Sequence, residues 1–217
     1  MIAILSSTYF GPIQWYRKLA HYEKVLIENC DSYQKQTYRN RCLIMTTNGV
    51  QTLTVPVNRH KSLPVTGKQF PTSSGELGSE VVISDHGKWQ HLHWNALMAA
   101  YSESPFFEFY ADDIKPLFDV KAGTPLYKHN LSITLKICEL IDIHPDLSFT
   151  GTYVHDYSEM PGTFDFRTAI TPKNPIPDND LNTTPYYQVF GAKHGFTPNM
   201  SILDLLFNMG PESIFYL

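Results

Sequence analysis

The sequence lacks most features of a secreted or membrane-spanning protein. It has only three cysteines, Cys30, Cys42 and Cys138, at wide spacings and without a CxxC pair, which is typical of reduced thiols in a cytoplasmic protein. The apolar start at residues 2–5 is too short for a signal peptide. No run approaches the roughly 18 apolar residues that cross a bilayer. We therefore expect a cytoplasmic chain without a membrane span.

Charge and familiar catalytic motifs are also scarce. Charged residues make up 18% of the 217 residues and the formal net charge is −4, so we expect no nucleic-acid partner. The patterns GxGxxG, GxxxxGK[ST], GxSxG and HExxH are absent. A nicotinamide dehydrogenase, P-loop NTPase, serine hydrolase or zincin therefore has no support from motifs, and no cofactor is indicated.

The apolar patterns that are present predict an α/β fold. The chain opens with a strand at 2–5, a polar loop, a helix at 13–21 and a strand at 25–27, which is a β-loop-α-β unit. Asn48-Gly49 lies between two apolar runs at 42–45 and 51–57 and predicts a hairpin. Because a hairpin is antiparallel, we expect a mixed central sheet flanked by helices.

Further helices are expected at 86–102, with Asp85 as its N-cap, at 106–110 and at 126–141. In the first of these, Trp89, Leu92, Ala96 and Ala100 share one face. The apolar residues Ile202, Leu205, Leu206 and Met209 predict an amphipathic C-terminal helix. We interpret residues 1–217 as one domain with long loops at about 58–80 and 150–184.

The first candidate site is the stretch QKQTYRNR at residues 34–41. Lys35, Arg39 and Arg41 lie beside amides, including Asn40, just after a predicted strand. Arginine matches the two-point geometry of phosphate and carboxylate oxygens, so these four residues are candidate contacts for a small anionic ligand. The alternative is a solvated edge strand whose charges only discourage aggregation.

The second candidate is the loop at 6–11 with the helix that follows it. Ligands of α/β proteins bind at the carboxyl ends of strands, and anions suit helix N-termini. Tyr9 and Gln14 are therefore candidate ligand contacts. An ordinary β-α turn is the alternative.

The third candidate is the histidine-rich segment at 86–95. His91 and His93 would point about 200° apart on a helix, so they cannot share one ion and we expect no metal site. His91 and Asn95 lie on one stripe at i, i+4. His91 is a candidate acid or base and Asn95 a candidate ligand contact, although a structural role fits histidines here too.

The fourth candidate is the polar side of the last helix, with Ser201, Asp204 and Asn208. Asp204 could be a buried carboxylate that orients the arginines of residues 34–41, and Asn208 could contact the ligand. Alternatively, Ser201-x-x-Asp204 is a variant capping box.

Several segments taken in order resemble the WbqC-like protein family. The most specific are Tyr38-Arg39-Asn40-Arg41 and SILDLLFNMG at 201–210. The others are the strand at 2–5 with Tyr9-x-x-Pro12, LTVPV at 53–57, Trp89, His91-Leu92, YSESPFF at 101–107, Tyr187-Gln188, Phe196 and Pro198. Many relatives begin the first loop with Gln-Pro, where this chain has Ser6-Ser7, so ligand contacts of that loop do not transfer.

The resemblance implies a role in bacterial surface-polysaccharide synthesis, including O-antigen, and a transferase has been suggested for the family. Our leading hypothesis is a transferase acting on a nucleotide-linked or phosphorylated sugar, with an acyl or aminoacyl group among the candidates for transfer. A non-catalytic ligand-binding or scaffold protein of the same machinery is the alternative. A nucleotidyltransferase ranks last, because the paired histidines expected after the first strand are missing.

Overall fold

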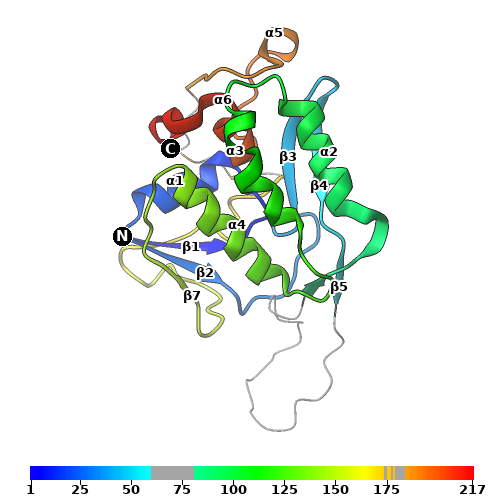
Figure 1. The fold of residues 1–217 in the computed structure, drawn as a ribbon. Coiled ribbons are helices and arrows are strands. Elements are labelled where there is room, and N and C mark those ends of the chain that lie inside the picture. Colours follow the sequence, from blue (N-terminus) through cyan, green and yellow to red (C-terminus); the bar gives the residue numbers. More distant parts are fainter. Residues whose placement is uncertain (60–80, 174, 177, 179–183) are drawn as a thin grey trace.

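A computed structural model describes residues 1–59, 81–173, 175, 176, 178 and 184–217, and shows an α/β protein (Figure 1). Its main sheet has four strands in the order β7-β2-β1-β8, and all three pairings are parallel. The strands are β1 (Ile2–Ser6), β2 (Lys24–Glu28), β7 (Leu147–Phe149) and β8 (Thr163–Asp165).

The predicted opening unit is confirmed. In β1, Ala3, Ile4 and Leu5 are fully buried, as expected for a central strand covered on both faces. Helix α1 (Ile13–His21) follows Pro12 and leads back to β2, which pairs with β1. This crossover brings the ends of β1 and β2 to the same edge of the sheet.

The predicted hairpin forms, but the expectation of a mixed central sheet was wrong. Strands β3 (Arg41–Thr46) and β4 (Gly49–Thr54) pair antiparallel in a sheet of their own. Strands β5 (Val57–Arg59) and β6 (Val81–Ile83) form another. The apolar run at 51–57 is divided between β4 and β5. The Val55 backbone N–H donates to the Asn40 carbonyl, and Pro56 has no backbone N–H to donate.

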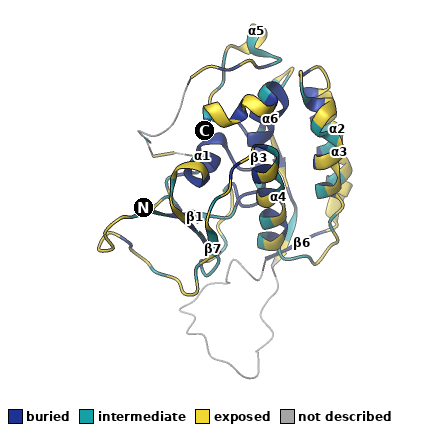
Figure 2. Cartoon of the chain, turned by 60° about the vertical axis from the view of Figure 1, so that its left-hand side comes forward, coloured by how far each residue is buried: buried dark blue, intermediate teal, exposed yellow. Residues whose placement is uncertain are grey.

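The remaining helices pack around this frame. They are α2 (Trp89–Tyr101), α3 (Phe107–Ile114), α4 (Leu126–Leu140), α5 (Gly191–His194) and α6 (Ile202–Met209), with 3-10 turns η2 (His86–Lys88), η3 (Lys115–Phe118) and η4 (Gly210–Tyr216). Helices α2, α3 and α4 expose one side (Figure 2). None of the helices described is long and apolar enough to cross a membrane.

Among the helices of the described residues, α6 is the most enclosed. It contacts α1, α2, α3 and β3, and every residue from Ile202 to Asn208 is buried. The helix predicted here is confirmed, but its polar side is buried along with its apolar stripe.

Helix α2 begins later than predicted. Gly87 and Lys88 have φ values of 79° and 48°, so the chain turns before the helix starts at Trp89, and the Asp85 side chain makes no capping bond. The buried face also differs from the predicted one. His93 and Leu97 are buried on it, whereas Leu92 is 59% exposed.

The two predicted long loops have different outcomes. The region 150–184 contains β8, which the sequence pattern missed because the strand has only three residues. Residues 60–80 of the other predicted loop lie outside the described part of the chain, as do 174, 177 and 179–183.

Gly210 ends α6, and a substitution at this position tests how tightly the end of the helix packs against Phe106. Its φ is +56°, and a Cβ atom there would lie 2.5 Å from the Phe106 ring. We expect Gly210→Ala to lower the free energy of unfolding by about 1–3 kcal/mol in urea titrations, because ring and backbone must both shift. Gly151→Ala is the control, since its Cβ would meet no atom within 4 Å and should change little.

Candidate functional site

Polar side chains gather where the parallel strands end. Glu28 is the last residue of β2 and is buried. Its carboxylate accepts hydrogen bonds from the Thr150 hydroxyl after β7 and from the Cys30 backbone N–H, both at 2.7 Å. A buried carboxylate at a strand end therefore ties two neighbouring strand ends together.

Arg167, just after β8, completes this network. Its Nη1 donates to Glu28 at 2.9 Å, while Nε and Nη2 donate to Asp165 at 2.9 and 2.6 Å. The guanidinium carbon also lies 5.1 and 4.9 Å from the ring centroids of Tyr153 and Tyr157. Arg167 thus joins the ends of β2 and β8 across the end of β1 and has little hydrogen-bonding capacity left.

A second buried ion pair joins Arg39 to Asp31, both in the segment that follows β2. Arg39 Nη2 also donates to the Ser6 hydroxyl at 2.9 Å, and Nη1 contacts the Thr37 hydroxyl at 3.5 Å. Burial raises the pKa of Asp31, and the positive charge of Arg39 opposes that effect. The pair fixes Arg39 against the end of β1.

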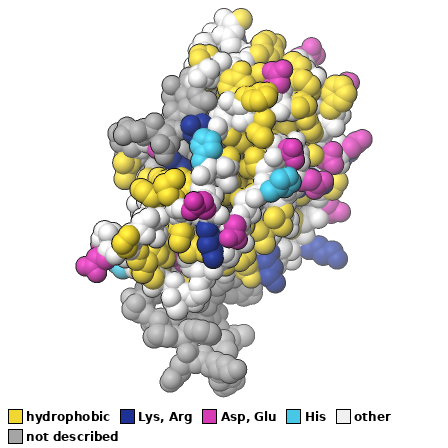
Figure 3. Space-filling model, turned by 90° about the vertical axis from the view of Figure 1, so that its left-hand side faces the viewer, with side chains coloured by type: hydrophobic (Ala, Val, Ile, Leu, Met, Phe, Trp, Pro, Cys, Tyr) yellow, Lys and Arg dark blue, Asp and Glu magenta, His cyan; other side chains and the backbone are white. Residues whose placement is uncertain are grey.

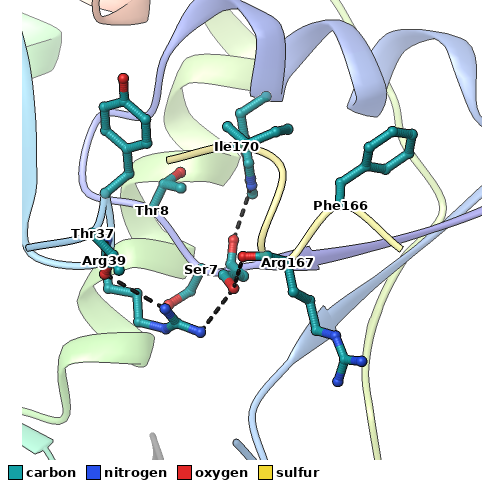
Figure 4. A pocket seen from close by; sticks show the side chains of 10 residues that line it. Ser7, Thr8, Thr37, Arg39, Phe166, Arg167 and Ile170 are labelled. Carbon is teal, nitrogen blue, oxygen red and sulfur yellow. Dashed lines mark hydrogen bonds between the residues drawn. The ribbon is translucent and has the colours of Figure 1, made fainter. Parts of the chain in front are cut away.

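A small cavity opens beside Arg39 (Figure 4). The Arg39 guanidinium donates to the Ser6 hydroxyl. In Figure 4 the Arg167 side chain points away from Arg39. The hydroxyl of Thr8 is buried and has no partner among the described residues. The cavity is lined by Ser6, Ser7, Thr8, Trp15, Thr37, Tyr38, Arg39, Phe166, Arg167 and Ile170. It combines a cation with hydroxyl donors at a strand end, which suits anionic oxygens.

Of the four candidates in 34–41, only Arg39 lines this cavity. Lys35 is exposed. Asn40 is buried, and its amide nitrogen donates to the Val55 carbonyl at 2.8 Å. Arg41 begins β3 and is partly buried, and its Nε has no partner among the described residues. Residues 34–41 therefore do not form one site: Arg39 lines the cavity, Asn40 bonds the Val55 carbonyl and Lys35 is exposed to solvent.

Tyr9 and Gln14 lie close by but do not line the cavity. Tyr9 is fully buried and its hydroxyl lies 2.9 Å from His93 Nδ1. Gln14 is also buried, and its amide donates to Asp178 at 2.7 Å. Both side chains hold neighbouring segments in place, so the prediction of direct ligand contacts is not reflected in the geometry.

His91 and Asn95 are exposed, and their side-chain nitrogens lie 2.9 Å apart. Two residues along a helix rotate a side chain by about 200°, so His91 points away from the buried His93. His91 is not among the residues that line the cavity. The structure therefore does not bring the predicted acid or base to Arg39.

Two other histidines are buried beside Tyr9: His93, which the sequence analysis considered only as a metal ligand, and His129, which no sequence pattern singled out. Ring centroids of His93 and His129 lie 5.7 and 6.0 Å from that of Tyr9. Burial lowers the pKa of each histidine to about 4. Both are therefore neutral at physiological pH. No group of three or more His, Cys, Asp or Glu residues that could hold a metal occurs within the described ranges.

Asp204 has different partners from those predicted. Its carboxylate accepts hydrogen bonds from the Tyr101 hydroxyl at 2.9 Å, from the Gln188 amide at 2.7 Å and from the Tyr186 hydroxyl. Burial raises the pKa of Asp204, and these three donors oppose the increase. The prediction that Asp204 orients an arginine was wrong, because these neutral donors surround it and Arg39 pairs with Asp31.

The neighbouring polar residues of α6 are also structural. Ser201 caps the helix, since its hydroxyl accepts from the Leu203 N–H at 3.3 Å. The capping box with Asp204 does not form, because the Ser201 N–H donates to the Leu43 carbonyl instead. The Asn208 amide donates to the Asp204 backbone carbonyl at 2.7 Å. Neither residue lines the cavity.

Comparison with known proteins identifies the family of the chain. A model of the WbqC-like protein family matches residues 7–161 and 179–216. The chain belongs to the WbqC-like protein family. The part of the chain that the family model matches includes Glu28, Asp31 and Arg39, whereas Asp165 and Arg167 lie between the two matched ranges.

One similar curated protein is the "Uncharacterized protein Rv1507c" of Mycobacterium tuberculosis (strain ATCC 25618 / H37Rv). It is 26% identical over 238 residues, which cover 100% of this chain and 96% of that protein. No solved structure matches the chain significantly.

The residues that sequence reasoning missed are chiefly Glu28, Asp31 and Arg167. Glu28 directly follows a predicted buried strand, so the strand-end rule could have identified it. Arg167 carried no such signal, because the three-residue strand before it was not recognised.

Replacing Asp204 tests its structural role. In Asp204→Asn an amide N–H₂ group replaces one acceptor oxygen and faces donors, so we expect a loss of about 1–3 kcal/mol or more in unfolding free energy. Ligand affinity of the folded variant should stay unchanged. Asp112→Asn, at an exposed position of α3, is the control. A marked loss of affinity in a folded Asp204→Asn protein would contradict this assignment.

The buried histidines predict how stability depends on pH. Their folded pKa values of about 4 lie below the ordinary value of 6.5, so the unfolded chain binds more protons between these values. Stability should be fully present above pH 6.5 and fall as pH drops towards 4, by up to roughly 3 kcal/mol per histidine.

Urea unfolding across this pH range measures the effect. His93→Gln/His129→Gln should flatten the dependence, whereas His144→Gln, at a side chain that is 81% exposed, should preserve it. The raised pKa values of Asp31 and Asp204 change stability with pH in the opposite direction. This contribution is the same in the wild type, the double variant and His144→Gln. An unchanged slope in the double variant would contradict the assignment.

Proposed function

We propose that this protein is a transferase of bacterial surface-polysaccharide synthesis that binds a phosphorylated or nucleotide-linked sugar beside Arg39. The observation that carries the proposal is the buried Arg39 guanidinium, which faces a cavity with the hydroxyls of Ser6 and Thr8 at the end of β1. Ligands of open parallel sheets bind at this edge. The transferase and pathway assignments rest on the family resemblance.

Arg39 is a better ligand contact than Arg167. The described partners of Arg39 involve Nη2 and, at 3.5 Å, Nη1, so its Nε–H remains available. In Arg167, by contrast, all three guanidinium nitrogens donate to carboxylates or carbonyls. Arg39 therefore binds the anion, and Arg167 holds the strand ends that form the cavity.

The carboxylate of Asp31 competes with any anion for Arg39. Burial already raises the pKa of Asp31, which favours its neutral form. An anion that binds Arg39 therefore weakens the attraction between Arg39 and Asp31.

The distribution of charge on the surface is consistent with a buried anion site. On the face shown in Figure 3, acidic and basic side chains are interspersed, without a broad patch of one sign. Recognition of an anion on that face therefore depends on local contacts rather than on a wide field of positive charge.

The alternative function, a non-catalytic binding protein, is favoured by one specific observation. The residues that line the cavity include no histidine, lysine or cysteine within the described part of the chain. His93 and His129 are buried elsewhere and neutral. Turnover of a bound sugar nucleotide in the presence of an acyl donor separates a transferase from a binding protein.

Two variants test the anion site by moving affinity in opposite directions. Asp31→Asn frees Arg39 from its counter-ion and should tighten binding of UDP-N-acetylglucosamine. Arg39→Gln/Asp31→Asn removes both charges, leaves no buried ion unpaired, and should weaken binding at least about tenfold. Isothermal titration calorimetry measures both effects.

Lys24→Ala is the matched control, since Lys24 is exposed at the opposite, amino end of β2. Its affinity should equal that of the wild type. Equal affinities of the single and double variants at positions 31 and 39 would show that Arg39 does not contact the ligand.

A further inference from the structure

A wide cleft lies at the amino edge of the main sheet, opposite the edge that carries Arg39. Its walls are residues 19–23 before β2, residues 142–146 before β7, and Ile214 and Leu217 near the C-terminus. The cleft has a volume of about 510 Å³, which is within the range of small-molecule sites. It therefore has room for a ligand of that size.

Acidic side chains gather at the rim of this cleft. Glu23, Asp142 and Asp146 are exposed there, and the lining includes no lysine or arginine within the described part of the chain. Glu23 pairs with the amino group of Met1. Asp142 and Asp146 are therefore the carboxylates that a ligand would meet.

Two helices also end at this cleft. Leu19, Ala20 and His21 are the last residues of α1 and line it, and so does Asp142, two residues after the end of α4. A helix C-terminus carries the equivalent of about half a negative charge. The helix ends and the carboxylates act in the same direction, and a cleft lined by one sign of charge concentrates ions of the opposite sign.

Asp142 stands against two local preferences. It follows α4 in a Schellman motif, in which the Ile143 N–H donates to the Cys138 carbonyl at 3.0 Å. The φ of Asp142 is +58°, at a position where glycine or asparagine is usual. Its carboxylate also lies beside the negative end of the helix. Asp142 therefore costs stability, as residues at functional sites often do.

We propose that this cleft binds a small amphipathic amine, with its ammonium group at the rim formed by Asp142 and Asp146. The apolar part of the ligand would lie on Ile143 and Leu217, which are buried in the wall of the cleft. An anionic ligand would be repelled by this rim, and an uncharged one would gain nothing from it. The site is separate from the anion site, because Arg39 lies at the other edge of the sheet.

Three ligands with the same alkyl chain, hexylamine, hexan-1-ol and hexanoate, test the requirement for positive charge. Nuclear magnetic resonance titrations of the wild type follow the backbone amides of Ala20 and Ile143. His21 and His144 also line the cleft, and histidine gains charge below about pH 6.5, so the titrations are carried out at about pH 8. Hexylamine should bind at least about tenfold more tightly than hexan-1-ol, and hexanoate more weakly than either. Higher ionic strength should reduce these differences.

Replacing the two carboxylates tests the rim. Asp142→Asn/Asp146→Asn should lower the affinity for hexylamine to that for hexan-1-ol. Asparagine suits the φ of residue 142 and removes a charge from the helix end, so Asp142→Asn alone should raise the urea midpoint of unfolding. Asp112→Asn, at an exposed position of α3 outside the cleft, is the matched control and should bind hexylamine like the wild type.

Three results would overturn the proposal. They are the absence of hexylamine binding, equal affinity of the wild type for hexylamine and hexan-1-ol, and an unchanged affinity for hexylamine in the double variant. A lowered urea midpoint in Asp142→Asn would show that the carboxylate has a structural role instead.

Discussion

Two buried ion pairs, Arg39–Asp31 and Arg167–Glu28, are the constraint on which the candidate site depends. A buried charge is costly unless it is paired and hydrogen-bonded, and removing one partner typically costs about 3–5 kcal/mol. These pairs therefore hold the segments after β2 and β8 in one arrangement. Arg167 spans the end of β1, since β2 and β8 pair with opposite edges of that strand. The short strand β8 thus gains order from its charges as well as from its backbone hydrogen bonds.

Local sequence patterns were sufficient to predict the elements that have a clear hydrophobic period or clear turn and breaker residues at their ends. Helices α1 and α6 have the predicted bounds, and the predicted hairpin forms with its turn at Thr47-Asn48, one residue before the predicted position. The same patterns could not show which sheet a strand joins, because that depends on long-range pairing, as for β3. They also placed the start of α2 too early, because the left-handed turn at Gly87 and Lys88 has no periodic signal.

For the site, sequence reasoning identified Arg39 but neither its partner nor its neighbours. Contacts such as Asp204 with Tyr101 join residues 103 positions apart, and no local pattern encodes them. His91 does not lie beside Arg39, because the buried face of α2 includes His93 instead. Two residues that are two positions apart on a helix lie on nearly opposite faces. The buried face of α2 therefore had to be known before either histidine could be assigned to the core or to solvent.

Of the two segments that most specifically mark the family, residues 38–41 reach the cavity through Tyr38 and Arg39, whereas SILDLLFNMG at 201–210 is part of the core. In SILDLLFNMG, Asp204 and Asn208 satisfy buried donors and carbonyls, and the rest of α6 packs against its neighbours. Similarity in such a segment is evidence for a shared fold, because core packing and buried hydrogen bonds restrict the residues allowed there. A residue that contacts a ligand must reach a cavity, and of the residues proposed from the sequence only Arg39 does so. Relatives that differ at this position but keep α6 would share the fold while binding different ligands.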